Sequence, residues 1–278
     1  MEQRAMPTVD FFGHRVSRLI MGSNPFNGGS HVGPEMDAEM DSYYTIENIK
    51  KALRYGQTCG INTTQLSGNH MFWKIMRDMA SEGDAPLWIA NTAPYMSSFQ
   101  GCLRQIMASK PIAIYHHGSE ADQMVHNGRV EELHDRLKMM RDTGLPVGLG
   151  THDPALVAYS RDHGWDVDFY MTAVYNIMKY NYRPSSSITG ISNSGEAFEE
   201  GDVPVMLDLV RQIDKPCLVF KILGASRVCT TDERIEERFR MVFETIKPTD
   251  CVVVGMFQRD RDQIRMNANL VKKYGQIL

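Results

Sequence analysis

The sequence lacks the features that mark membrane, secreted and nucleic-acid-binding proteins. No apolar run approaches the roughly 20 residues needed to cross a bilayer. The N-terminal stretch MEQRAMPTVDFFG has no apolar core followed by a small-residue cleavage site. The net charge is -4, and no basic cluster is present to attract nucleic acid or an anionic membrane. We therefore expect a cytoplasmic protein whose partners are small molecules, with an oligomeric state that the sequence does not indicate.

Cysteine is scarce, and its spacing forms no motif. The five cysteines include no C-x-x-C pair, and an odd number does not suit a disulfide framework. Cys217 and Cys251 lie inside apolar runs, as buried free thiols in a reducing compartment do. The H-x-H and H-E-x-x-H spacings of common metal sites are absent as well. Any metal site must therefore be assembled from residues that are distant in the sequence.

Short apolar runs recur along the chain. Their continuous apolar character, without strict alternation, is typical of parallel strands that are buried on both faces. Eight such runs predict strands, at residues 18–22, 61–65, 87–91, 112–117, 146–151, 166–171, 217–222 and 251–255.

Helix candidates lie between these runs. Thr45 is a predicted N-cap, and Asp153 followed by Pro154 begins another helix. The segment 130–144 has its apolar residues on one stripe and ends at Gly144. Further candidates are the amphipathic segments 230–247 and 261–275 and weaker ones that begin near His70, Met96 and Pro204.

This alternation of strands and helices predicts a (β/α)8 barrel, or TIM barrel, as a single domain over residues 1–278. The alternative is an open doubly wound sheet, which favours a G-x-G-x-x-G motif that MGSNPFNGGSH does not contain. Long connections follow three predicted strands, at residues 23–44, 118–128 and 176–201. They predict a site at the carboxyl ends of the strands, with 176–201 as a candidate lid. We interpret the acidic stretch EMDAEMDSYY in the first connection as a solvated loop.

Six stretches resemble the aldo-keto reductases, in the same order along the chain. FFGHRVSRLIMGSNPF is similar to their N-terminal hairpin and first strand, and KALRYGQTCGINTTQL to the stretch that ends in their catalytic Asp. IAIYHHG resembles the strand that ends in their active-site His. LKMMRDTGLPVGLGTHDP, MTAVYN and VVVGMFQRDRDQIRMNANL resemble the later strands and the helix that contact the cofactor. The resemblance implies a barrel with a short N-terminal hairpin.

The same resemblance implies that most of the catalytic tetrad is lost. The family's Asp corresponds to Gln65, its Tyr to His70 and its Lys to Asn91 or Thr92, so only the His remains, as His117. Reduction of a carbonyl needs a proton donor whose pKa is lowered by the Lys and the carboxylate, so the fold carries over and the redox activity does not. The cofactor contacts change at Thr151, His152, Thr172 and Met266 and persist at Gln263 and Asn267.

Several imidazoles are expected to converge on the barrel mouth. His31 follows the first strand, His117 ends the fourth and His152 follows the fifth. Strand parity lets only one of His116 and His117 face inward, and the family match favours His117. Because neutral imidazole is a common metal ligand, we predict a divalent metal site (Zn, Fe, Co or Mn) at His31, His117 and His152. The alternative is acid–base chemistry by histidine without a metal.

Lys221 is the sharpest single candidate. It lies in CLVFKI, where Cys217 and Val219 share its face of the predicted strand. A lysine in a buried strand is costly unless it reaches a polar cavity, where it can clamp an anion, act as a base or form a Schiff base. The alternative is a structural ion pair at the rim. The predicted catalytic set is His70 and His117 as acid and base, Lys221 as clamp, and Gln65 and Asn91 as orienting amides.

The loops after the last two strands are candidates for a phosphate or dinucleotide site. Barrel enzymes often bind phosphate there through loop N–H groups and a helix N-terminus. The alternative is a solvated, salt-bridged helix start, because RDRD alternates in charge. The predicted cofactor contacts, for NADP in particular, are Thr151, Gly224, Ser226, Arg227, Arg259 and Arg261.

These patterns lead to three functional hypotheses. The first is an enzyme that moves protons on a small polar carbonyl or sugar-like substrate, of isomerase, lyase or hydratase type, with or without a divalent metal. The second is a divergent NAD(P)H-dependent aldo-keto oxidoreductase. The third is a barrel that binds or scaffolds without catalysis.

Overall fold

The computed structural model describes residues 4–182 and 196–277. Eight parallel strands close into a barrel in the order β10-β3-β4-β5-β6-β7-β8-β9. The predicted (β/α)8 barrel is therefore confirmed. The barrel strands are β3 (Leu19–Gly22), β4 (Thr63–Leu66), β5 (Leu87–Asn91), β6 (Ala113–His116), β7 (Val147–Thr151), β8 (Phe169–Ala173), β9 (Cys217–Phe220) and β10 (Cys251–Gly255).

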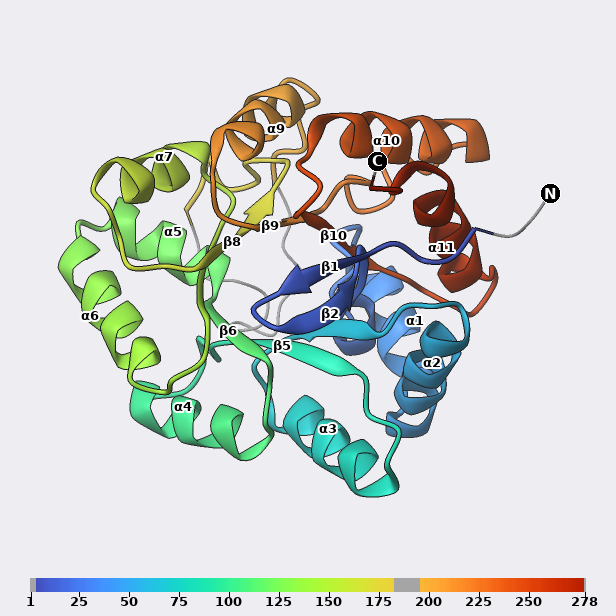
Figure 1. Cartoon of the computed structure of the whole chain (residues 1–278), viewed down its shortest axis with the longest axis horizontal. Coiled ribbons are helices and arrows are strands. Elements are labelled where there is room, and N and C mark those ends of the chain that lie inside the picture. The colour runs from blue at the N-terminus through green and yellow to red at the C-terminus, as the bar shows by residue number, and fades with distance from the viewer. Residues whose placement is uncertain (1–3, 183–195, 278) are drawn as a thin grey trace.

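Helices surround the barrel and pack their apolar stripes on its outer face (Figure 1). Two predicted caps are present: Thr45 accepts a hydrogen bond from the N–H of Asn48, and Asp153 accepts one from the N–H of Ala155. The helices are α1 (Pro34–Tyr43), α2 (Ile46–Thr58), α3 (His70–Glu82), α4 (Phe99–Ala108), α5 (Gly118–His126), α6 (Val130–Arg141), α7 (Pro154–Asp162), α9 (Asp202–Gln212), α10 (Asp232–Thr245) and α11 (Gln263–Tyr274), with a 3-10 turn η1 at Asn24–Asn27.

The expected N-terminal hairpin closes one end of the barrel. β1 (Thr8–Phe11) pairs with β2 (His14–Ser17) in antiparallel register, and the hairpin crosses the centre of the ring in Figure 1. Phe11 is fully buried and meets the ring of Phe169 edge-on, with ring centroids 5.1 Å apart. The hairpin thus seals the floor of the barrel with aromatic side chains, which leaves the carboxyl ends of the strands for a site.

The barrel interior is filled tightly around Phe169. A Cβ atom added at Gly148, on the neighbouring strand, would lie 2.5 Å from the ring of Phe169. Only glycine leaves room for that ring at this position.

Several segments differ from the sequence predictions. The acidic stretch of the first long connection is the helix α1, begun by Pro34 and by Glu35 in its first turn, and is not a loop. The second connection is the helix α5. β8 begins at Phe169, three residues later than predicted, and the side chain of Asp168 just before it accepts from Arg141 and from the N–H of Val147.

Half of the third long connection, 176–201, lies outside the described residues, at 183–195, and its role as a lid stays a prediction. Among the helices of the described ranges, none has the length and apolar character that crossing a membrane requires.

Candidate functional site

A cavity of about 630 Å³ opens at the carboxyl ends of the strands. This volume lies within the range of small-molecule sites. All eight barrel strands or the residues just after them contribute to its lining, through Gly22, Gln65, Asn91, Tyr115, His117, Gly150, Met171, Phe220, Lys221 and Val253 among others.

Lys221 reaches this cavity by leaving the strand. In β9 Leu218 lies in the interior cluster with Phe220 packed against it, whereas Cys217 and Val219 face the helices. Continued alternation would send Lys221 outward as well. The strand ends at Phe220, however, and Lys221 has a φ of 60°, in the left-handed region, so that its side chain lines the cavity. The predicted place of Lys221 at the mouth agrees with the structure, but the predicted strand face is wrong.

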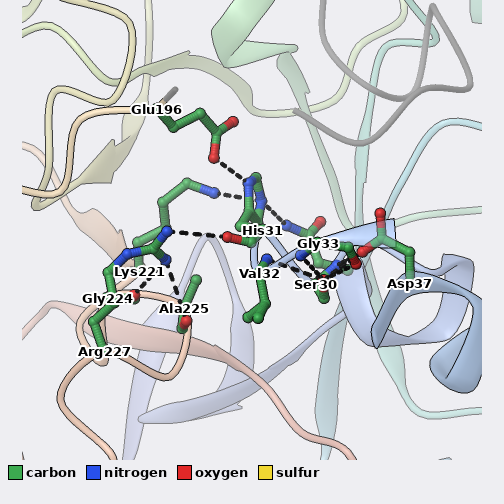
Figure 2. A network of polar contacts seen from close by, with 11 residues as sticks. Ser30, His31, Val32, Gly33, Asp37, Glu196, Lys221, Gly224, Ala225 and Arg227 are labelled. Carbon is green, nitrogen blue, oxygen red and sulfur yellow. Dashed lines mark hydrogen bonds and ion pairs between the residues drawn. The ribbon is translucent and has the colours of Figure 1, made fainter. Parts of the chain in front are cut away.

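His31 connects Lys221 to a carboxylate. Its Nε2 lies 2.9 Å from Nζ of Lys221 and 3.0 Å from Nδ2 of Asn24, and its Nδ1 lies 2.7 Å from Oε2 of Glu196. Figure 2 shows Lys221 and Glu196 pointing at the His31 ring from two different loops. Since an ammonium and an amide N–H both donate, Nε2 is the acceptor and the ring proton sits on Nδ1, where it is donated to Glu196. We call these residues the Lys221–His31–Glu196 chain.

Burial and neighbouring charges set the protonation of this chain. Burial first of all lowers the pKa of Lys221, the charge of Glu196 opposes it and the charge of Arg227 adds to it, and the net pKa is about 8. Burial, followed by the charge of Lys221, lowers the pKa of His31, so the ring is neutral. Burial raises the pKa of Glu196, but the hydrogen bond from His31 and the nearby positive charge outweigh it and lower that pKa to about 2. The Lys221–His31–Glu196 chain therefore contains a carboxylate, a neutral imidazole and an amine that can lose its proton near neutral pH.

His152 and Asp122 form a second pair at the cavity. Oδ2 of Asp122 accepts from the backbone N–H of His152 at 3.0 Å and lies 2.9 Å from its Nδ1. The other carboxylate oxygen accepts from the hydroxyl of Thr151. Both side chains are buried, with exposed fractions of 5% and 1%. The carboxylate thus fixes the proton on Nδ1 and leaves Nε2 as the nitrogen available to a ligand.

Phe220 brings the two groups together. Its ring centroid lies 5.5 Å from Nζ of Lys221 and 5.4 Å from the ring of His152. The two groups also interact electrostatically, because the charge of His152 lowers the pKa of both His31 and Glu196. Two proton-transfer groups, each backed by a carboxylate, therefore share one cavity.

His117 faces inward, as predicted, and His116 faces the helices. His117 lines the cavity, whereas the ring of His116 lies 5.9 Å from that of Phe99. Burial is the main reason that the pKa of His117 falls to about 4. Its Nδ1 is buried without a hydrogen-bond partner in the part of the chain that the structure describes. His117 is thus a neutral imidazole with an unused nitrogen.

Two amides complete the polar lining. Gln65 and Asn91 both line the cavity, as predicted, and both are buried. Oδ1 of Asn91 accepts from the backbone N–H of Gly68, which fixes the orientation of the amide. A substrate with hydroxyl or carbonyl groups would find donors and acceptors here.

His70 lies elsewhere. It is the exposed first residue of α3, stands edge-on to Trp73 at 5.0 Å and does not line the cavity. Its predicted position at the mouth is wrong because β4 ends at Leu66 and the chain has turned into the helix by His70. We therefore give His70 no part in the chemistry.

The predicted metal site is not assembled. Within residues 4–182 and 196–277, no three His, Cys, Asp or Glu side chains are grouped to hold a metal ion. Both ring nitrogens of His31 are occupied, one of them by an ammonium group, and Nδ1 of His152 is held by Asp122. A metal ligand needs a free lone pair and no adjacent cation. Because His31 has no free nitrogen, the set of His31, His117 and His152 in this arrangement does not fit a metal, and we derive no step through one.

Only some of the predicted cofactor contacts line the cavity. Ser226 and Arg261 do, and so do Gln263 and Asn267, the two positions kept from the family pattern. The other four predicted contacts do not line it. Thr151 is turned toward Asp122, Gly224 and Arg227 bond to each other, and Arg259 pairs with Glu39 and Asp260 at the surface.

Three residues of the site were not identified from the sequence. Glu196 lies 165 residues from His31 and Asp122 lies 30 residues from His152, so only the folded barrel brings these pairs together. The signal for Glu196 was weak, since it lies in the connection predicted as a lid. Tyr115 lines the cavity two residues before His117, and the inward parity assigned to His117 could have identified it.

Comparison with known proteins shows the fold. No protein-family model matches the chain, and no curated protein does either. Among solved structures, the apo form of Gox0644 is 11% identical over 99% of this chain and 97% of that chain, with a TM-score of 0.54. Dihydropteroate synthase of Yersinia pestis with a sulfonamide drug is 10% identical over 96% and 97%, with a TM-score of 0.54.

A mandelate oxidase variant with (S)-mandelic acid is 10% identical over 98% of this chain and 76% of that chain, with a TM-score of 0.53. At such identities the likeness establishes the barrel architecture and no particular activity. The resemblance to the aldo-keto reductases stays a prediction. The fold of this chain is therefore shared by barrel proteins of different kinds, among them a synthase and an oxidase.

Proposed function

We propose that this protein is an enzyme that moves protons on a small, polar, carbonyl-containing or sugar-like substrate, in an isomerase, lyase or hydratase type of reaction. One observation carries the proposal: the Lys221–His31–Glu196 chain and the His152–Asp122 pair meet at one cavity around Phe220. Catalytic acids and bases need pKa values near the working pH, and the pKa of Lys221 is about 8.

The roles follow from the contacts. Lys221 holds the carbonyl oxygen as an ammonium or takes a proton as an amine, and His31 accepts the proton that Lys221 releases. His152 moves the second proton through Nε2, because Asp122 holds Nδ1. Gln65 and Asn91 orient hydroxyl groups of the substrate.

The test is proton exchange with solvent. Short hydroxyaldehydes and hydroxyketones are incubated with the protein in heavy water, and loss of the hydrogen next to the carbonyl is followed by NMR. We expect exchange of at least one compound, reduced about 100-fold or more in Lys221→Met and in His152→Gln. Lys74→Met, which alters an exposed lysine paired with Asp78, is the matched control and should behave like the unaltered protein.

Two results would contradict the proposal. One is a panel in which no compound exchanges, which would favour a barrel that binds without catalysis. The other is exchange that survives both substitutions, which would show that Lys221 and His152 do not carry the reaction.

A second candidate is the NAD(P)H-dependent oxidoreductase, favoured by one observation. The cavity extends over β10 to Arg261, Gln263 and Asn267, where the family resemblance places the cofactor. The fit is partial, because Arg261 is paired with Asp232 at 2.7 Å. Titration of the protein with NADPH tests it: quenching of tryptophan fluorescence supports this candidate, and its absence removes it.

A further inference from the structure

Lys221 differs from Lys50 and Lys247, two other buried or half-buried lysines, in the partner of its amine. Nζ of Lys247 donates to the carboxylate of Asp250, and Nζ of Lys50 donates to that of Glu82. In the described ranges, Nζ of Lys221 has no carboxylate within 4.0 Å, and its acceptor is Nε2 of His31. An imidazole nitrogen, unlike a carboxylate of low pKa, can take the proton and leave a neutral amine.

The surroundings of the amine also suit a nucleophile. Nζ lies over the ring of Phe220, and Met171 and Ile222 add apolar surface to the same cavity. Arg227 lies close by: its Nη2 donates to the His31 carbonyl at 3.1 Å, and its guanidinium stacks on Phe198 at 3.8 Å. Figure 2 shows Arg227 beside the Lys221 side chain. A nearby fixed cation and an apolar wall both disfavour the ammonium form.

We propose that Lys221 is a nucleophile that forms an imine with the carbonyl carbon of an aldehyde or ketone substrate. This inference rests on the proposed function, because it names how the same site activates the hydrogen next to the carbonyl.

The step balances without an oxidant or a further reactant. His31 takes the proton of the ammonium, and the lone pair of Nζ then forms a bond to the carbonyl carbon. The π electrons move to the oxygen, which receives a proton from Nε2 of His152 in its imidazolium form. The C–O bond of this carbinolamine breaks, and the oxygen leaves as water with one of the two protons that remain on Nζ. The products are a protonated imine and one water, and the protonated imine withdraws electrons from the adjacent C–H bond.

Reduction traps the adduct. The full-length protein is incubated with glycolaldehyde or dihydroxyacetone and sodium borohydride, and the modified lysine is located by peptide mass spectrometry. At pH 7 an amine with a pKa of about 8 is neutral roughly a hundredfold more often than an ordinary lysine. We therefore expect modification at Lys221 to be at least about tenfold faster than at Lys74.

Three variants make the result specific. Lys221→Met should remove the adduct, and Lys74→Met should leave it. His31→Gln, which keeps a polar side chain but cannot take the proton, should slow trapping about tenfold or more. A thermal melt shows that each variant is folded. Modification spread equally over exposed lysines would overturn the proposal that Lys221 forms an imine.

The two proposals fail in different ways. Proton exchange that depends on Lys221 without a trapped adduct overturns the imine and leaves the acid–base function intact. An adduct on Lys221 without any exchange supports the nucleophile and removes the proposed reaction type. The absence of both overturns both.

Discussion

Nζ of Lys221 lies 2.9 Å from Nε2 of His31, although 190 residues separate them in the chain. Both residues have a positive φ, 60° for Lys221 and 59° for His31. Left-handed backbone is costly for residues other than glycine and gathers at functional sites. The contact thus holds two strained loops together at the cavity, and most of the predictions below depend on it.

Activity should rise with pH through about 8. The pKa of Lys221 is about 8, and the neutral amine is the form that takes a proton or attacks a carbonyl. The pKa values of His31 and Glu196 are both lowered, so neither group titrates near pH 8. A pH–rate profile of the exchange reaction checks this. A flat profile between pH 6 and pH 9, roughly the span in which such an amine titrates, would contradict it.

Two charge substitutions should move that profile in opposite directions. The carboxylate of Glu196 raises the pKa of Lys221, and the guanidinium of Arg227 lowers it. Glu196→Gln should therefore shift the rising limb to lower pH, and Arg227→Gln should shift it to higher pH, each by the order of one unit. The pH–rate profiles of the two variants are compared directly. Shifts of the same sign would show that the two charges do not act on Lys221.

Asp122→Asn should impair both the reaction and the fold. The carboxylate accepts from His152 and from the hydroxyl of Thr151, and it fixes the His152 tautomer. We expect a rate loss of about 100-fold or more, because the amide can hold the wrong tautomer. A stability loss of about 2 kcal/mol follows from weaker acceptance of those bonds. Exchange rates and urea unfolding measure the two effects, and a variant with full activity would contradict the assigned role.

Acid should destabilise the protein through buried imidazoles. Burial lowers the pKa of His116 to about 3 and that of His117 to about 4. In the unfolded chain these rings bind protons near pH 6.5, so the unfolded state binds more protons and the free energy of unfolding falls as pH drops from about 6.5 toward 4.

The variant His116→Leu tests this linkage. Between pH 7 and pH 5, the free energy of unfolding of this variant should fall by about 2 kcal/mol less than that of the unaltered protein. Urea unfolding at the two pH values gives the difference, with His163→Gln, at an exposed imidazole, as the control. An unchanged pH dependence in His116→Leu would show that this ring does not contribute.

Gly148→Ala should destabilise the barrel. The added Cβ would lie 2.5 Å from the Phe169 ring, which is packed against Phe11 and cannot retreat. Overpacking of this kind costs about 1–3 kcal/mol. Gly201→Ala is the control, because nothing lies within 4 Å of its added Cβ. Thermal melts compare the two, and equal melting temperatures would contradict the tight packing inferred for the interior.

Particular residues show what the sequence can and cannot predict. The eight apolar runs predicted the barrel because a strand buried on both faces carries its signal locally. Strand parity allowed only one of His116 and His117 to face inward, the family match favoured His117, and His117 lines the cavity. Lys221 shows the limit of parity, because one left-handed residue after the strand reverses the direction of the side chain. His70 shows the same limit at β4, where an error of a few residues in the strand end moved a residue from the mouth to a helix.

The partners of the catalytic groups could not be predicted. Glu196 and Asp122 are ordinary acidic residues in their local sequence, and their roles arise from contacts across 165 and 30 residues. The predicted metal site depends on long-range contacts of the same kind. The imidazoles do approach one cavity, but an ammonium and a carboxylate occupy both nitrogens of His31, and a second carboxylate holds Nδ1 of His152.

The most direct test of the account is the ionisation of Lys221 itself. Protein labelled with 13C at the lysine ε-carbons is titrated by NMR, and the Lys221 signal is assigned by its absence in Lys221→Met. The account predicts a midpoint of about 8 for this signal. A midpoint at or above about 10, the value of an ordinary lysine, would show that Lys221 stays charged at working pH and would contradict its role as base and nucleophile.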